Sequence, residues 1–214
     1  MKNQGDATLI LCDYGQVLAG FDRDRCAVSF ERLLGRPIPR AGAELLEQLL
    51  QPFEAGEITP EQFLDAVREP LGLRHVRDEA LFQEAWCSIL WALVDSIAVI
   101  RRRLQVEGVQ VHIVTNTDPW RLAYASDKLG MADLFQSCTA SFEEGVTPKG
   151  ADSSMWAVAR RRAEAVLGEA GTRVIGIDDL EQNLSPALED GTLTHGIVFR
   201  DASQLETELQ GLGL

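Results

Sequence analysis

Four short apolar segments, set apart by stretches with helical spacing, constrain the fold of this chain more than any other feature of its sequence. Each has the length of a buried strand that stops at a loop, and they are Thr8–Cys12, Val109–Val114, Arg173–Ile177 and His195–Phe199. Between the last three, apolar residues recur at helical spacing over residues 119–128, 153–167 and 180–188. Strands that alternate with helices indicate a parallel sheet covered on both faces. We therefore predict an α/β fold.

The pattern changes over residues 22–93, where strand-like alternation is missing. Apolar residues recur there at helical spacing, for example Phe30, Leu33 and Leu34. The segment 79–93 is richly apolar, and Phe82, Trp86 and Trp91 within it are predicted to belong to a helical core. We therefore predict an all-helical cap at residues 22–93, inserted into a core formed by residues 1–21 and 94–214.

The charge of the chain excludes some classes of partner. It has 20 Lys and Arg residues against 33 Asp and Glu residues, for a formal net charge of −13. Such a surface does not attract nucleic acid or an anionic membrane over a broad area. The basic run Arg101–Arg103 lies in a helical pattern and is predicted to be a solvated helix face. A phosphorylated small molecule still fits if the site supplies a cation.

The sequence also predicts a cytoplasmic location. The four cysteines are far apart without CxxC spacing, which is typical of reduced thiols. Residues 1–7 are not followed by the apolar stretch of a secretory signal, and the apolar segment 85–94 is too short to span a bilayer.

Polar residues gather where the predicted strands end, and one loop before a helix adds more. They are Asp13, Tyr14 and Gly15; Thr115, Asn116, Thr117 and Asp118; Asp178, Asp179 and Asn183; and Thr147, Pro148 and Lys149. Parallel strands place these groups at one edge of the sheet, where ligands bind. One carboxylate can attack phosphorus there, other oxygens can hold a hard cation, and the lysine and hydroxyl groups can hold phosphoryl oxygens. The set predicts phosphoryl transfer.

Three of these segments resemble the motifs of the haloacid dehalogenase (HAD) superfamily, in the same order. Ile10–Leu18 resembles motif one, Ile113–Thr117 resembles motif two, and Val174–Asp179 with Asn183 and Gly191 resembles motif four. In the cap, residues 56–59 and Phe63 are similar to one branch. That branch contains the bacterial α-glucose-1-phosphate phosphatases and the N-terminal phosphatase domain of soluble epoxide hydrolases.

The resemblance implies a Rossmann-like core, a helical cap and Mg²⁺ as cofactor. It implies that Asp13 is the nucleophile and a metal ligand. The backbone carbonyl of Gly15 and the carboxylate of Asp178 would be further metal ligands, and Asp179 would complete the acidic pair around the metal. The implied activity is that of a phosphatase for a small soluble phosphorylated metabolite, acting through a phospho-aspartate; a sugar phosphate is indicated by the branch alone.

The resemblance further implies that Thr115 and Asn116 bind the phosphoryl group. Tyr14 and Gly15, directly after the nucleophile, are predicted to bind substrate as well, and the Tyr14 side chain either lines the substrate entrance or packs beneath the cap. His112, within a predicted strand, is expected to be a packed or hydrogen-bonded core residue.

Two positions depart from the motifs. Gly15 stands where most phosphatases of the superfamily have a second aspartate that serves as general acid and base. The usual Lys-Pro order is transposed to Pro148-Lys149, although a long side chain next to Gly150 can still reach the site. We predict that Lys149 is catalytic.

Two other functions stay open. A 2-haloacid dehalogenase is one, although its tyrosine follows the nucleophile by two positions and Tyr14 follows Asp13 by one. The other is a catalytically weak or inactive member that serves as a binding or regulatory module, which Gly15 and the transposed Lys149 motivate. Substrate identity and oligomeric state are not readable from the sequence.

Overall fold

The core of the molecule is a parallel five-stranded sheet with the order β5-β4-β1-β6-β7. The computed structural model describes residues 7–73, 76–143, 145–150, 152–167 and 173–214. The strands are β1 (Thr8–Cys12), β4 (Val109–Thr115), β5 (Cys138–Ala140), β6 (Arg173–Asp178) and β7 (His195–Val198). The four predicted strands and the α/β class are confirmed. The sequence did not indicate β5, a three-residue strand at the edge of the sheet.

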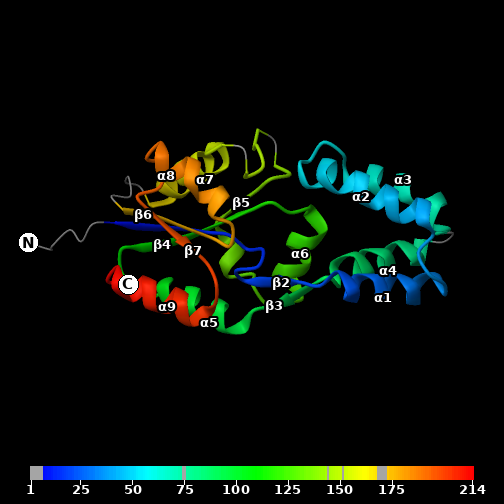
Figure 1. The fold of residues 1–214 in the computed structure, drawn as a ribbon, viewed down its shortest axis with the longest axis horizontal. Coiled ribbons are helices and arrows are strands. Elements are labelled where there is room, and N and C mark those ends of the chain that lie inside the picture. Colours follow the sequence, from blue (N-terminus) through cyan, green and yellow to red (C-terminus); the bar gives the residue numbers. More distant parts are fainter. Residues whose placement is uncertain (1–6, 74–75, 144, 151, 168–172) are drawn as a thin grey trace, which may run out of the picture.

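Helices cover both faces of this sheet (Figure 1). They are α5 (Val94–Arg103), α6 (Pro119–Asp127), α7 (Ser154–Leu167), α8 (Glu181–Glu189) and α9 (Ala202–Gly211), with a short 3₁₀ turn at Leu134–Gln136. Alternate residues of β1 pack into different clusters: Ile10 and Cys12 belong to the cluster that contains residues of α5 and α9, and Leu9 and Leu11 to the cluster with α7 and α8. Every residue of β1 is therefore buried, as expected for the central strand of a covered parallel sheet.

Four further helices lie between the first and second strands of the core. They are α1 (Arg23–Leu34), α2 (Arg40–Glu54), α3 (Pro60–Leu71) and α4 (Val76–Cys87), and they enclose a separate aromatic cluster that includes Phe30, Phe53, Phe63 and Phe82. Local signals fix their ends: Asp22 caps α1, and Thr59 with Gln62 forms a capping box at α3. The domain boundaries predicted from the sequence stay a prediction; we call α1–α4 the cap.

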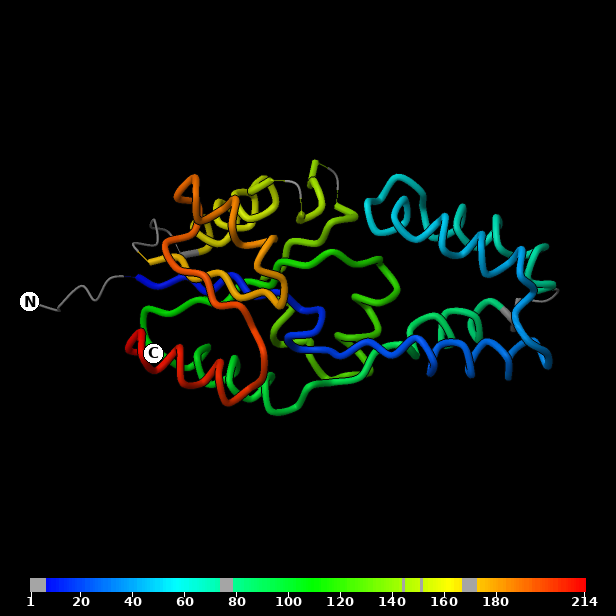
Figure 2. The backbone as a smooth tube through the Cα atoms, viewed as in Figure 1, coloured from blue at the N-terminus to red at the C-terminus, as the bar shows by residue number. Residues whose placement is uncertain are grey.

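The prediction that residues 22–93 are entirely helical is wrong at one place. Residues Leu90–Ala92 form β3, which pairs antiparallel with β2 (Ala19–Phe21). In Figure 2 the chain leaves the core along β2 and returns beside it along β3. Trp91 consequently lies on this ribbon, where its ring covers Gly20, and not in the core of the cap. Three-residue strands are too short for period-two alternation to be recognised.

No helix in the described ranges has both the length and the apolar composition needed to cross a bilayer.

Candidate active site

The predicted nucleophile lies at the middle of one edge of the sheet. Cys12, the last residue of β1, pairs with Ile113 of β4 and Ile177 of β6, so the loops after all three strands meet at that edge. The backbone N–H of Asp13 donates to the Ile177 carbonyl at 2.8 Å, which continues the ladder by one residue. Asp13 and Asp178 thereby become near neighbours, and both are buried (7% and 0% exposed).

Lys149 reaches both of these carboxylates. Its Nζ lies 2.8 Å from Oδ1 of Asp13 and 2.7 Å from Oδ2 of Asp178. The amide of Asn116 fixes the Lys149 backbone, since its Oδ1 accepts from Lys149 N–H at 2.8 Å and its Nδ2 donates to the Lys149 carbonyl at 3.0 Å. This double hydrogen bond anchors the loop at the sheet edge, so the transposed Pro-Lys order still delivers the ammonium group to the site.

The hydrogen bonds leave one carboxylate oxygen of Asp13 free to react. Oδ1 accepts from Lys149 and, at 2.7 Å, from the backbone N–H of Tyr14. Oδ2 has no hydrogen-bond partner among the residues that the structure describes. Both oxygens of Asp178, by contrast, are held: Oδ1 by Leu180 N–H and Asn183 Nδ2, each at 2.9 Å, and Oδ2 by Lys149. The fully held Asp178 is suited to orient its neighbours, and Asp13 Oδ2 is suited to attack an electrophile.

The same edge has a donor set that fits a magnesium ion. Asp13, Asp178 and Asp179 each offer a carboxylate oxygen, and these oxygens lie within 4.8 Å of one another. Mg²⁺ prefers oxygen ligands of this kind. Burial raises the pKa of Asp13, against the opposing effect of Lys149, and burial together with Asp178 raises the pKa of Asp179. Three carboxylates around one ammonium leave an excess of negative charge, which a divalent cation would offset.

The other predicted site residues differ in what they present. Thr115 is fully buried, and its hydroxyl lies 3.4 Å from the carbonyl of Asn116. Asn116 uses one of its two amide N–H groups on Lys149. At Gly15, a Cβ atom would stand 4.0 Å from Asp13 Oδ2 and 3.2 Å from Cε2 of Phe21. A Cβ atom at this position would therefore crowd the Phe21 ring, and glycine permits that ring to pack close to the loop after the nucleophile.

The prediction that Tyr14 binds substrate is wrong for its side chain. Tyr14 is fully buried, and its ring packs edge-on against Phe21 and Phe135 with centroids 6.4 and 5.5 Å away. The strand ends with Cys12 and Asp13 on the ladder, which turns the next side chain under the ribbon of β2 and β3 and into the core cluster. What Tyr14 brings to the site is its backbone N–H, which holds Asp13 Oδ1.

His112 is confirmed as a hydrogen-bonded core residue. It is 2% exposed, and its ring nitrogens lie 2.7 Å from Ser137 Oγ and 2.8 Å from Thr139 Oγ1. Burial, with a smaller effect from Arg162, lowers its pKa to about 4.

The sequence did not indicate a cavity of about 750 Å³ that lies between the cap and the core. Arg121, at its wall, pairs with Glu54 of the cap at 3.0 Å and lies 3.4 Å from Asp118. The indole N–H of Trp86, a residue predicted to be cap core, donates to Asp118 at 2.9 Å, and the Arg121 guanidinium lies over the Trp86 ring. Asp118 is the N-cap of α6, and it is the member of this group that the sequence already placed among the polar residues after the second predicted strand.

No protein-family model matches this sequence, and no curated protein matches it. Solved structures do resemble it. A HAD family enzyme from Bacteroides thetaiotaomicron, complexed with magnesium and inorganic phosphate, has a TM-score of 0.70 at 20% identity, over 92% of this chain and 96% of its own. A predicted HAD-like family hydrolase from Porphyromonas gingivalis has 0.69 at 17% identity, over 97% and 98%. The L-2-haloacid dehalogenase from Xanthobacter autotrophicus has 0.53 at 18% identity, over 97% and 83%. These likenesses establish the fold as Rossmann-like α/β of the HAD type.

Proposed function

We propose that this chain is a magnesium-dependent hydrolase of the HAD superfamily, a phosphatase for small soluble phosphate monoesters that acts through a phospho-aspartate. One observation carries the proposal: the Lys149 ammonium bridges Asp13 and Asp178 at 2.8 and 2.7 Å, beside the carboxylate of Asp179. The magnesium and phosphate bound to the Bacteroides enzyme of the same fold support it. A cytoplasmic location, and the absence of nucleic-acid and membrane partners, are part of the same proposal.

In the proposed reaction, Asp13 Oδ2 attacks phosphorus. The bond from Oδ2 to phosphorus forms while the ester bond to the leaving alcohol breaks, and the leaving oxygen takes its proton from solvent because Gly15 has no side chain to supply one. Lys149 holds the other oxygen of Asp13 and places positive charge beside the phosphoryl group. Bound by Asp13, Asp178 and Asp179, Mg²⁺ would supply further compensation for the phosphoryl charge.

The second half of the reaction restores the enzyme. A water molecule attacks the phosphorus of the phospho-aspartate, and the bond from phosphorus to Asp13 Oδ2 breaks. Inorganic phosphate leaves and Asp13 is again a carboxylate. Asn116 and Thr115, at the end of β4, are the residues proposed to hold the phosphoryl oxygens during both steps.

Phosphate release from a panel of phosphate monoesters, with and without Mg²⁺, tests this function. We expect magnesium-dependent release that falls at least ~10³-fold in Asp13→Asn, because the amide is not a nucleophile. A folded protein that releases no phosphate from any substrate in the panel overturns the proposal and favours a binding module. Halide release from 2-haloacids in place of phosphate release favours the dehalogenase.

A further inference from the structure

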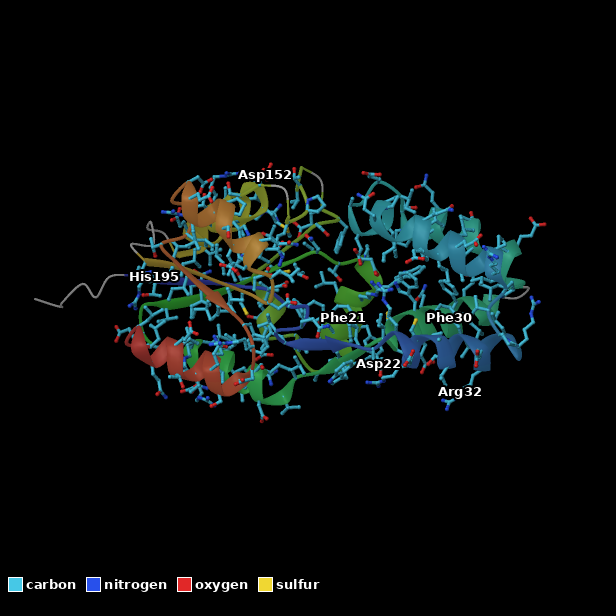
Figure 3. The ribbon with its side chains drawn as sticks, viewed as in Figure 1. Phe21, Asp22, Phe30, Arg32, Asp152 and His195 are labelled. Atoms are coloured by element: carbon cyan, nitrogen blue, oxygen red, sulfur yellow. The ribbon has the colours of Figure 1, made fainter. Side chains whose placement is uncertain are left out.

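The cavity between the cap and the core is lined in part by the segment that follows the nucleophile. Gln16 and Phe21, which line it, come from the loop and strand that directly follow Asp13. The point where a Gly15 side chain would begin is 3.2 Å from the Phe21 ring and 4.0 Å from Asp13 Oδ2. Figure 3 shows Phe21 where the core meets the cap, with Phe30 farther along α1. The cavity wall therefore begins at Gln16, three residues after the nucleophile, and the cavity is a candidate site for the alcohol portion of a phosphate ester held at Asp13.

The walls of the cavity are mainly apolar. The apolar side chains come from the ribbon and from three helices of the cap, and include Phe21, Ala27, Phe30, Leu46, Leu50 and Trp86. Leu46 and Leu50 stay half-buried although they lie on the apolar side of α2. Covering such surface with an apolar group is favourable, by about 25 cal/mol per Å² removed from water. The volume of about 750 Å³ lies within the range of about 300–1,000 Å³ that is usual for ligand cavities.

Most buried polar groups in the wall already have partners, and among the described residues of the wall the exception is the Nε of Arg121, which has no hydrogen-bond partner. The guanidinium of Arg121 is paired with Glu54 and lies beside Asp118, and Trp86 donates its indole N–H to Asp118. The remaining polar lining residues, Gln16, Arg23 and Glu47, are exposed. A sugar entering this space would lose the hydration of several hydroxyl groups and would find one unpaired buried donor in the described wall, the Nε of Arg121. A substrate with a second anionic group would gain little from Arg121, because the carboxylates of Glu54 and Asp118 already offset its positive charge.

From this lining we infer that the cavity receives a bulky, apolar leaving group, so the substrates are phosphate monoesters of aromatic or branched aliphatic alcohols. This inference rests on the proposed phosphatase function. It departs from the sugar phosphate that the sequence resemblance indicated.

Substrate pairs that differ only in the leaving group test the inference. We expect kcat/KM to be about tenfold higher for 1-naphthyl phosphate than for phenyl phosphate, and about tenfold or more higher for cyclohexylmethyl phosphate than for glucose 6-phosphate. Acetyl phosphate, with a small leaving group, reports on the phosphatase chemistry itself. Equal or reversed preferences in both pairs, with acetyl phosphate still hydrolysed, overturn the inference and leave the function standing. Absence of magnesium-dependent phosphate release from acetyl phosphate and from every ester of the two pairs overturns the function.

Two matched variants of α2 locate the effect. Ala43 lines the cavity and Ala41 does not, and both are exposed on the same helix. Ala43→Phe is expected to lower the ratio of naphthyl to acetyl phosphate turnover about fivefold or more, and Ala41→Phe is expected to leave it as in the wild type. The same change in both variants overturns the assignment of the cavity.

Calorimetric titration examines the cavity without turnover. We expect 1-naphthol to bind the wild type and Ala41→Phe, and to bind Ala43→Phe more weakly. Glucose binding that equals or exceeds 1-naphthol binding overturns the inference whatever the enzyme hydrolyses.

Discussion

Lys149 supplies the positive charge that allows the carboxylates of Asp13 and Asp178 to lie close together. Its ammonium group is buried and lies within 2.8 Å of both carboxylates, so it offsets part of their mutual repulsion. The two carboxylates in turn raise the pKa of Lys149, although its burial acts in the opposite direction. Asp13 and Asp178 thus keep the Lys149 ammonium protonated.

Lys149→Met should therefore damage both activity and stability. Removing the cation from a buried ion pair costs about 3–5 kcal/mol of unfolding free energy, since two carboxylates are left without a counter-charge. We expect kcat/KM to fall at least ~100-fold, and Mg²⁺ to stabilise this variant more than it stabilises the wild type. Urea unfolding with and without Mg²⁺ measures the second effect. Exposed Lys128→Met is the control, and equal losses in the two variants would contradict the role given to Lys149.

His112 should make the stability fall as the pH drops. The unfolded state takes up a proton at this residue near pH 6.5, whereas the folded state does so only near its pKa of about 4. Between these values the unfolded state binds more protons, so up to about 3 kcal/mol of unfolding free energy is lost as the pH falls from 6.5 to 4. Urea unfolding of the wild type and His112→Gln at several pH values isolates this part, because all other titrating groups are shared. Parallel pH profiles for the two proteins would refute it.

At the scale of single residues, the sequence predicted those site groups that follow strand ends. The proximity of Asp13 and Asp178 follows from parallel strands alone, and the reach of Lys149 follows from its side-chain length. The Arg121–Glu54 ion pair joins residues that lie 67 positions apart on two helices. No local sequence pattern predicts a contact between residues so far apart. Tyr14 was ambiguous for a related reason: whether a side chain turns inward depends on the ribbon above it.

At the scale of elements, the turn between α2 and α3 makes a close backbone contact between the cap and the core, and this contact can be tested by substitution. Gly56 has φ +69°, and a Cβ atom there would clash with the backbone carbonyl of Phe142, just after β5. Gly35, at the end of α1, has a similar φ of +64° with nothing within 4 Å of its would-be Cβ. Both glycines permit a left-handed backbone, but only Gly56 also permits close contact with another segment.

Gly35→Ala should therefore destabilise by about 1 kcal/mol, the strain of the left-handed conformation. Gly56→Ala carries the same strain and in addition forces the cap away from residue 142, for roughly 1–3 kcal/mol more. Chemical denaturation of the two variants gives the difference. Equal destabilisation of the two variants would contradict the prediction, because it would mean that the cap can move away from residue 142 without a cost in unfolding free energy.

Element length decided which strands could be predicted. The four predicted segments are apolar runs of five or six residues with loop signals at their ends. The strands β2, β3 and β5 have three residues each, and they exist because a neighbouring segment supplies their hydrogen bonds. Such strands form because of tertiary contacts, and the local sequence pattern does not show which segments will pair.

For the molecule as a whole, the cluster of carboxylates at one edge of the sheet lowers the free energy of unfolding, and a bound cation can offset this loss. The loops after β1 and β6 bring Asp13, Asp178 and Asp179 together, so their repulsion opposes the closing of the entire sheet. A ligand that binds only the folded state adds RT ln(1 + [L]/Kd) to its stability, which is about 2.7 kcal/mol at a hundredfold excess over Kd. Global unfolding should therefore respond to magnesium, although the ion would contact only one edge.

We expect saturating Mg²⁺ to raise the Tm of the wild type by roughly 5–10 °C, because 1 kcal/mol corresponds to about 2–4 °C in a chain of this size. Asp178→Asn removes one carboxylate charge from the set and should abolish most of that rise. Asp152→Asn, an exposed aspartate outside the set, should keep it. Thermal unfolding with EDTA and with Mg²⁺ gives each protein its own reference, so any direct effect of the substitution cancels. A rise of the same size in both variants would place the magnesium elsewhere on this acidic protein.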